Sequence, residues 1–200
     1  MQKTEQNLKV RRMVVTGLLI ATIAVLMLTG LGFIRIGPIS ASLLCLPVLI
    51  GVMAEGLGVG VILGLAFGFL SFLKAFSDPT IFAPYFMNPL VSIVPRVLIP
   101  IAAWLALRIL MPKRQENKRL QFFARTLACF VGAAVNTVGV LGAIYIACSW
   151  GYVVPGVSAE TVGGILLGIG LANGLPEAGV MMVVAPLVMT AMDRSMHRHR

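Results

Sequence analysis

Six long apolar segments dominate this sequence, and they constrain the fold more than any other feature. A helix that crosses a bilayer needs about 20 predominantly apolar residues. The mean hydropathy is +0.97 and 12% of the 200 residues are charged, about half the fraction found in a soluble domain. The sequence therefore predicts an all-α, polytopic membrane protein, with residues 1–200 forming a single membrane domain. The segments lie at about residues 13–34, 39–54, 57–76, 88–111, 121–149 and 160–192.

Basic residues fall into clusters that border the apolar segments. Thirteen of the 16 lysines and arginines lie near the N-terminus, between residues 108 and 125, or near the C-terminus. Such clusters are typical of cytoplasmic loops beside transmembrane helices. The first two clusters share one side of the membrane only if an even number of spans separates them. The short second segment is therefore predicted to cross the membrane, and the alternative is a re-entrant hairpin. The result is six transmembrane helices with both termini in the cytoplasm.

The placement of the charges also indicates the kind of partner. The net charge is +9, but no base-reading motif accompanies it. Basic clusters beside apolar helices suit anionic headgroups instead. The sequence predicts contact with membrane lipid and no nucleic acid.

Catalytic and metal chemistry have little support in the sequence. Both histidines, His197 and His199, lie in the last five residues, and the three cysteines are far apart within apolar segments. A metal site or a nucleophile with its base would need clustered side chains of these kinds. The sequence predicts no enzyme, no metal and no cofactor, so any energy source has to come from another protein.

Small residues recur at four-residue spacing in three of the segments. Such rows let helix backbones approach closely in a membrane. Internal packing explains most of them, but the row in the first segment can equally receive a partner protein. The residues are Gly17 and Ala21, then Gly60, Gly64 and Gly68, and then Gly139, Ala143 and Ala147.

Polar side chains at mid-depth are the strongest functional feature, because a charge in hydrocarbon is costly and normally faces a cavity or a partner. Arg96 and Asn136 lie within the fourth and fifth segments, and Asn173 and Glu177 lie one helical turn apart in the sixth. Pro176 removes one backbone donor there, and broken helices of this kind often bind ligands.

These groups predict a polar pocket near the outer face that binds a small molecule. Further candidates for substrate binding are Asn88, Ser92, Lys74 and Tyr85. The alternative is structural: Arg96 and Glu177 form a buried ion pair, and the asparagines join helices. An ion pair and a site are compatible, since a ligand can lie between the two charges.

Several motifs, in this order and spacing, resemble the substrate-binding S component of energy-coupling factor (ECF) vitamin transporters. The likeness covers about residues 13–190. The motifs are Gly37-Pro38-Ile39-Ser40-Ala41, Leu46-Pro47-Val48-Leu49-Ile50-Gly51, the glycine-rich stretch from Gly60 to Gly68, Val94-Pro95-Arg96, Asn136-Thr137-Val138 and Asn173-Gly174-Leu175-Pro176-Glu177-Ala178.

The resemblance implies a six-helix protein of the bacterial plasma membrane that captures a vitamin outside the cell. It implies a transmembrane coupling subunit and two ATPase subunits as partners, and toppling of the protein in the membrane to release the vitamin. Gly17 and Ala21 match the family's docking motif, with glycine in place of the first alanine, and residues 35–39 correspond to a lid over the pocket. The pattern of Asn136, Asn173 and Glu177 is most similar to the pantothenate-type branch, with pyridoxine and hydroxymethylpyrimidine as alternative vitamins.

Two other classes of function stay open at this point. One is an autonomous small-solute secondary transporter or channel that works as a homodimer, with the small-residue faces as its interface. The other is an assembly or sensor protein that transports nothing and binds no ligand.

Overall fold

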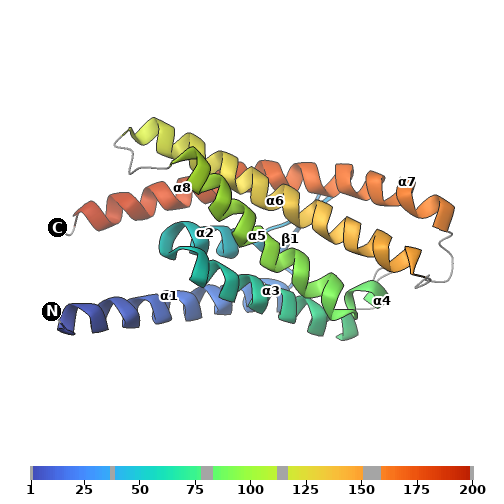
Figure 1. Ribbon diagram of the computed structural model, residues 1–200, viewed down its shortest axis with the longest axis horizontal. Coiled ribbons are helices and arrows are strands. Elements are labelled where there is room, and N and C mark those ends of the chain that lie inside the picture. The colour runs from blue at the N-terminus through green and yellow to red at the C-terminus, as the bar shows by residue number, and fades with distance from the viewer. Residues whose placement is uncertain (1, 37–38, 78–82, 112–116, 151–158, 199–200) are drawn as a thin grey trace.

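The computed structural model describes residues 2–36, 39–77, 83–111, 117–150 and 159–198. Its long helices run side by side along one axis, and the N- and C-terminal ends lie at the same end of the molecule (Figure 1). We call this the terminal end. The elements are α1 (Gln2–Leu28), β1 (Phe33–Ile36), β2 (Ile39–Ser42), α2 (Cys45–Glu55), α3 (Leu57–Ser77), α4 (Ala83–Phe86), α5 (Pro89–Leu110), α6 (Lys118–Ser149), α7 (Ala159–Ile169), the π-helical turn η1 (Gly170–Gly174) and α8 (Leu175–Arg198).

The protein is a nearly all-helical, multi-pass membrane protein. Within the described residues, five helices are apolar and long enough to cross a membrane. The predicted segments 57–76, 88–111 and 121–149 are confirmed as helices to within a few residues. The five are Lys9–Leu28, Leu57–Ser77, Pro89–Leu110, Lys118–Ser149 and Gly163–Met192, the last of which combines parts of α7 and α8 with η1.

The first two predicted segments differ from the structure. Gly30 has φ of +73°, a conformation that favours glycine, and α1 ends at Leu28 rather than at residue 34. A short antiparallel hairpin of β1 and β2 follows, in which Phe33 pairs with Ser42. Within the predicted span 39–54 the helix begins only at Cys45, and the 11 residues of α2 rise only about 16 Å. The strict all-α prediction was therefore wrong at this hairpin. Neither the spacing of apolar residues nor the hydropathy revealed the two strands.

Close backbone contacts hold α3, α5 and α6 together. A Cβ added at Gly64 would lie 2.6 Å from the carbonyl oxygen of Arg96, and one at Gly68 would lie 2.8 Å from Cα of Ile93. On α6, a Cβ at Gly139 would lie 3.2 Å from Cβ of Pro95. The glycines of the third and fifth segments thus serve internal packing, and they bring α5 close to both neighbours.

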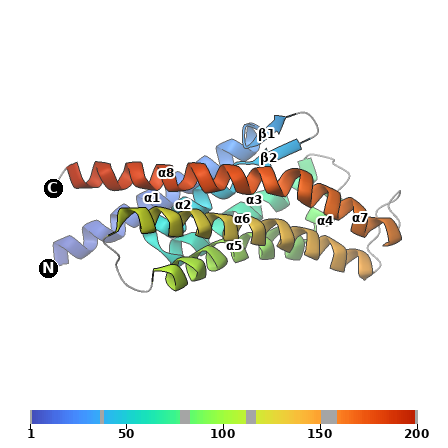
Figure 2. The same cartoon turned by 90° about the horizontal axis from the view of Figure 1, so that it is seen from above.

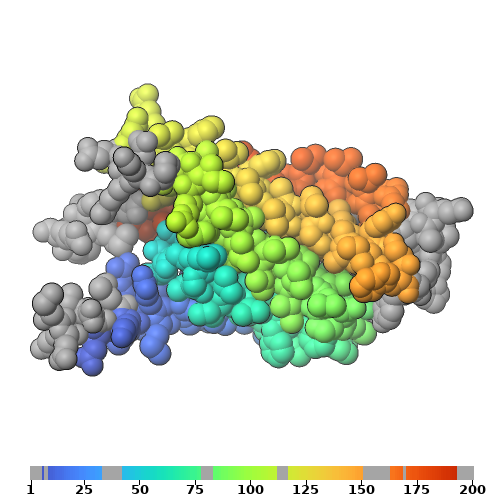
Figure 3. Space-filling view, in the orientation of Figure 1, coloured from blue at the N-terminus to red at the C-terminus, as the bar shows by residue number. Residues whose placement is uncertain are grey.

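Helix α1 is packed differently. It lies along one edge of the molecule (Figure 3), and only 11% of its apolar span is buried. Gly17 and Ala21 are both exposed. A Cβ added at Gly17 would meet no atom within 4 Å among the described residues outside its own helix backbone. The small-residue face of α1 is therefore open, unlike those of α3 and α6.

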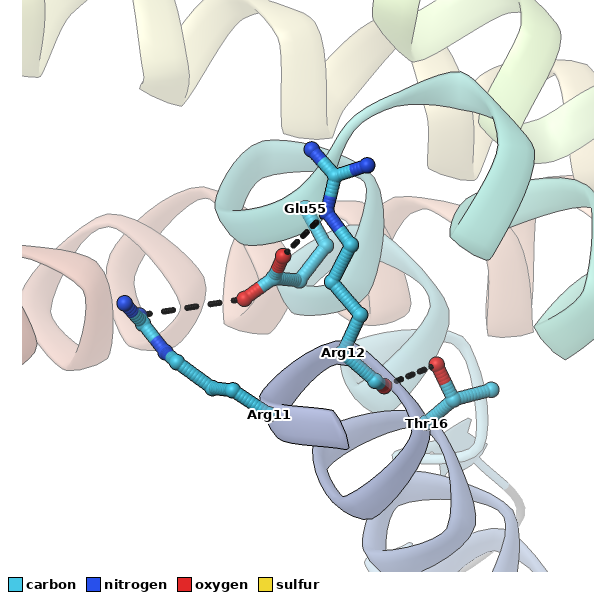
Figure 4. A network of polar contacts seen from close by, with 4 residues as sticks. All are labelled: Arg11, Arg12, Thr16 and Glu55. Carbon is cyan, nitrogen blue, oxygen red and sulfur yellow. Dashed lines mark hydrogen bonds and ion pairs between the residues drawn. The ribbon is translucent and has the colours of Figure 1, made fainter. Parts of the chain in front are cut away.

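Polar contacts attach α1 near both ends of its apolar span Lys9–Leu28. Near the terminal end, Arg12 Nε lies 3.2 Å from Glu55 Oε2 and Arg11 Nη2 lies 3.8 Å from Glu55 Oε1, as Figure 4 shows. At the other end, Lys74 Nζ donates to the carbonyl oxygen of Met27 at 2.7 Å. These contacts join α1 to α2 and α3 while its opposite face remains exposed.

Candidate functional site

A cavity whose lining includes two buried charged side chains lies where α3, α5, α6, η1, the start of α8 and the β2–α2 connection meet. Its volume is about 190 Å³, below the roughly 300–1,000 Å³ of pockets for drug-sized ligands, so it suits a small solute. It lies in the half of the bundle farther from the terminal end, since Arg96 is only two turns into α5 from that side. The lining residues are Ser42, Leu44, Phe67, Ser71, Arg96, Asn136, Thr137, Val140, Leu141, Gly170, Asn173, Gly174 and Glu177.

Arg96 supplies the positive charge of the cavity. Its side chain is buried, and Nη1 donates to the carbonyl oxygen of Val91 at 3.0 Å. The guanidinium carbon lies 5.0 Å from the ring centroid of Phe86 and 5.6 Å from that of Phe67, distances at which cation–π attraction operates. The rings position the guanidinium, and its Nε has no hydrogen-bond partner among the described residues.

Glu177 supplies the negative charge, and protein donors hold it in place. Its Oε1 accepts from Cys45 Sγ at 3.2 Å and from Asn136 Nδ2 at 3.5 Å. The backbone N–H of Ser42 also hydrogen bonds to this carboxylate. Cys45 is the first residue of α2, so the carboxylate lies at a helix N-terminus, where the helix dipole favours a negative charge.

The two buried charges do not neutralise each other directly. Within the described part of the chain, the ion pairs join Glu55 to Arg11 and Arg12, and none joins Arg96 to Glu177. The alternative prediction, a direct ion pair between Arg96 and Glu177, is therefore not found in this structure. Both charged side chains line one cavity, as a ligand with complementary groups requires.

Two buried polar atoms at this cavity lack a hydrogen-bond partner among the described residues. They are Nε of Arg96 and Oδ1 of Asn136. Most buried polar groups in folded proteins are hydrogen bonded, and leaving one unpaired costs free energy. One free donor and one free acceptor at a single cavity favour a polar ligand there.

The π-helical turn shapes the remaining wall. Cβ atoms added at Gly170 and Gly174 would each lie 2.7 Å from a side-chain carbon of α6, in Leu141 and Thr137 respectively. Glycine at both positions lets η1 approach α6 closely. Turns of this kind often occur at functional sites, and Pro176 just beyond it donates no backbone hydrogen bond. The sequence predicted the break at Pro176 but not the wider turn.

Four predicted site residues are not among those that line the cavity. Asn88 caps α5, accepting from Leu90 N at 3.0 Å, and Ser92 Oγ donates to the carbonyl oxygen of Phe86 at 2.5 Å. Tyr85 is buried in a second apolar cluster, where its hydroxyl accepts from Cys148 Sγ at 3.1 Å. Lys74 makes the contact to α1 described above. The structure brings Arg96, Asn136, Asn173 and Glu177 together in the lining of the cavity. The other four predicted residues, Asn88, Ser92, Tyr85 and Lys74, lie outside this lining.

The cavity also contains residues that sequence reasoning missed. Ser42 and Ser71 line it, and Cys45 contacts Glu177 from behind the lining. Ser71 lies one turn after Phe67 on α3, a spacing that would have placed both on one face. Ser42 and Cys45 carry no such signal, because the hairpin that positions them was not predicted. Of the predicted lid at 35–39, residues 37 and 38 lie outside the described residues.

The hairpin itself lies beside the middle of the last helical span (Figure 2), where β2 contacts both η1 and α8. It thereby brings Ser42 to Glu177. In the described residues, no group of three or more metal-ligating side chains occurs. Charges and amides arranged in this way can bind a polar solute reversibly.

The sequence of this chain is similar to known transporter proteins. A family model described as "ECF transporter, substrate-specific component" matches residues 11–189. The chain is also 28% identical over 174 residues to the pantothenic acid transporter PanT of Lactococcus lactis subsp. cremoris (strain MG1363). That alignment covers 79% of this chain and 80% of PanT.

Proposed function

This chain belongs to the family of ECF transporter substrate-specific components, and from that membership we propose that its cavity captures pantothenate for uptake. The family is a transporter component and not an enzyme, and its members serve vitamin uptake. The cavity lined by Arg96, Asn136, Asn173 and Glu177 is the proposed vitamin site.

One observation carries the choice of ligand: Arg96 is buried at the cavity and no carboxylate of the described residues forms an ion pair with it, while protein donors hold Glu177 separately. Pantothenate has a carboxylate that matches a guanidinium. Its hydroxyl and amide groups match Asn136, Asn173 and Glu177. Pyridoxine and hydroxymethylpyrimidine have no carboxylate, so either would leave the charge of Arg96 unpaired, at a cost that disfavours them. The similarity to PanT supports the same choice.

We further propose how the protein engages its transporter. The exposed face of α1 at Gly17 and Ala21 docks the transmembrane coupling subunit, because small residues allow close helix contact in lipid. Two ATPase subunits supply the energy, and toppling of this chain delivers the vitamin across the cell membrane. In this arrangement α2 completes six helices, the terminal end is cytoplasmic, and the cavity is nearer the outside.

Direct binding tests the proposal. The full chain, purified in detergent, is titrated calorimetrically with pantothenate, pyridoxine and hydroxymethylpyrimidine. We expect one pantothenate per chain and much weaker binding of the other two. Equal binding of all three, or no binding of pantothenate, contradicts the assignment. Native mass spectrometry of gently purified protein gives an independent result, since a retained ligand is identified by its mass.

A second test separates this function from an autonomous transporter. The chain is reconstituted alone in vesicles and supplied with a proton or sodium gradient. No uptake is expected without the ATPase subunits. Uptake driven by the gradient alone would show that the chain is a secondary transporter.

A further inference from the structure

Cys45 is a fully buried residue that does not line the cavity but contacts Glu177, which does. It is 0% exposed, and its Sγ donates to Glu177 Oε1 at 3.2 Å. Cys45 also belongs to the apolar core, which includes Val48, Leu49 and Met181. A thiol is a weak donor, but it is the group that joins α2 to the acidic side of the cavity.

The contact matters because of where the negative charge of Glu177 is held. Its carboxylate faces the start of α2 and accepts bonds from Cys45, the Ser42 backbone and Asn136. Each donor compensates part of the cost of burying the charge, and so does the helix dipole. The carboxylate is therefore stable without direct contact to the nearby cation.

Arg96 has the complementary property. Its hydrogen bond goes to a neutral carbonyl, its contacts are aromatic, and its Nε has no partner in the described residues. Unless the carboxylate is held elsewhere, the most favourable partner for a buried guanidinium is a buried carboxylate. A direct Arg96–Glu177 pair would occupy the groups that a ligand needs.

We propose that Cys45 is a positioning residue for the vitamin site: its thiol holds Glu177 at the start of α2 and so keeps Arg96 available to an anionic ligand group. The proposal rests on the proposed function for the identity of the ligand. Cys45 itself does not touch the ligand and acts through Glu177.

Loss of the thiol donor then shifts the balance between two partners for Glu177. Without it, the Glu177 carboxylate retains the long bond from Asn136 Nδ2 to Oε1 and the contribution of the Ser42 backbone. The carboxylate gains more from Arg96, which then competes with the ligand. We expect the affinity for pantothenate to fall about tenfold, the usual effect of losing one hydrogen bond to a charged group.

Three substitutions of Cys45 separate the hydrogen bond from packing. Cys45→Ser keeps a donor, Cys45→Ala removes it, and Cys45→Val removes it while filling the space. Calorimetric titration of each full-length variant with pantothenate is expected to give near-wild-type affinity for serine and about tenfold weaker binding for alanine and valine. Thermal unfolding without ligand establishes that each variant is folded. If the valine variant binds like wild type, or the serine variant is as weak as alanine, the positioning role is refuted.

An infrared measurement tests the contact without any vitamin. The S–H stretching band of Cys45 is the one lost in Cys45→Val, and a hydrogen-bonded thiol has this band at lower frequency than a free one. We expect the band to be shifted in the wild-type protein and to move back in Glu177→Ala. An unshifted band overturns the inference even if pantothenate binds. A shifted band with no pantothenate binding would refute the proposed ligand alone.

Discussion

Replacement of Arg96 by glutamine is the sharpest test of the vitamin site. Arg96 is 7% exposed and no carboxylate of the described residues pairs with its guanidinium, so the ligand carboxylate is the proposed partner. Truncating one partner of a buried, hydrogen-bonded charge pair costs about 2–5 kcal/mol. At about 3 kcal/mol, the dissociation constant for pantothenate rises roughly 150-fold. Calorimetric titration in detergent measures this change.

The stability of the ligand-free protein should not fall when Arg96 is replaced by glutamine. A buried charge without an ion pair costs desolvation free energy, and within the described part of the chain the Arg96 side chain makes one hydrogen bond, to the carbonyl oxygen of Val91. We therefore expect Arg96→Gln to unfold at the same temperature as wild type or higher when no vitamin is present. A large drop in ligand-free stability would mean that Arg96 is a structural residue.

A matched control lies on the same helix. Arg108 is exposed near the far end of α5, where its guanidinium carbon lies 5.0 Å from the Trp104 ring centroid. Arg108→Gln removes the same charge outside the cavity and should leave pantothenate affinity unchanged. The alcohol analogue of pantothenate provides a second control, because it lacks the carboxylate and should bind wild type and Arg96→Gln equally. If Arg96→Gln binds pantothenate within threefold of wild type, the proposed charge pairing is refuted.

Three further predictions address other parts of the molecule. Glu177→Ala should abolish measurable pantothenate binding while the protein stays folded, and unchanged affinity in a titration would exclude this side chain from the site. Gly17→Leu should preserve vitamin binding but block uptake by the complete transporter, whereas Gly179→Leu, at an equally open position on α8, should preserve both; equal uptake by the two variants would reject the docking face. Gly64→Ala should lower the free energy of unfolding by about 1–3 kcal/mol, because its Cβ would lie 2.6 Å from the Arg96 carbonyl, and an unchanged denaturant midpoint would contradict the close packing of α3 on α5.

Sequence reasoning located the acidic and basic centres of the cavity because their cost in hydrocarbon is a local property. Arg96 and Glu177 stand out in apolar segments without reference to any other residue. Lys74 and Tyr85, which the same reasoning also predicted as substrate-binding residues, do not line the cavity, since their depth near a helix end suits an anchor as well as a site. Whether such a residue is an anchor or a site residue depends on its neighbours. Lys74 contacts Met27, and Tyr85 contacts Cys148.

Hydropathy alone determined that this chain lies in a membrane and where most of its helices run, because the transfer of apolar residues into lipid depends on each segment by itself. The tertiary structure decided that Glu177 is held by Cys45, 132 residues away, rather than by Arg96. It also decided that α1 keeps its small residues exposed while α3 buries them. Contacts between distant segments depend on how the helices pack and on the hairpin before α2, and no local pattern encodes that geometry.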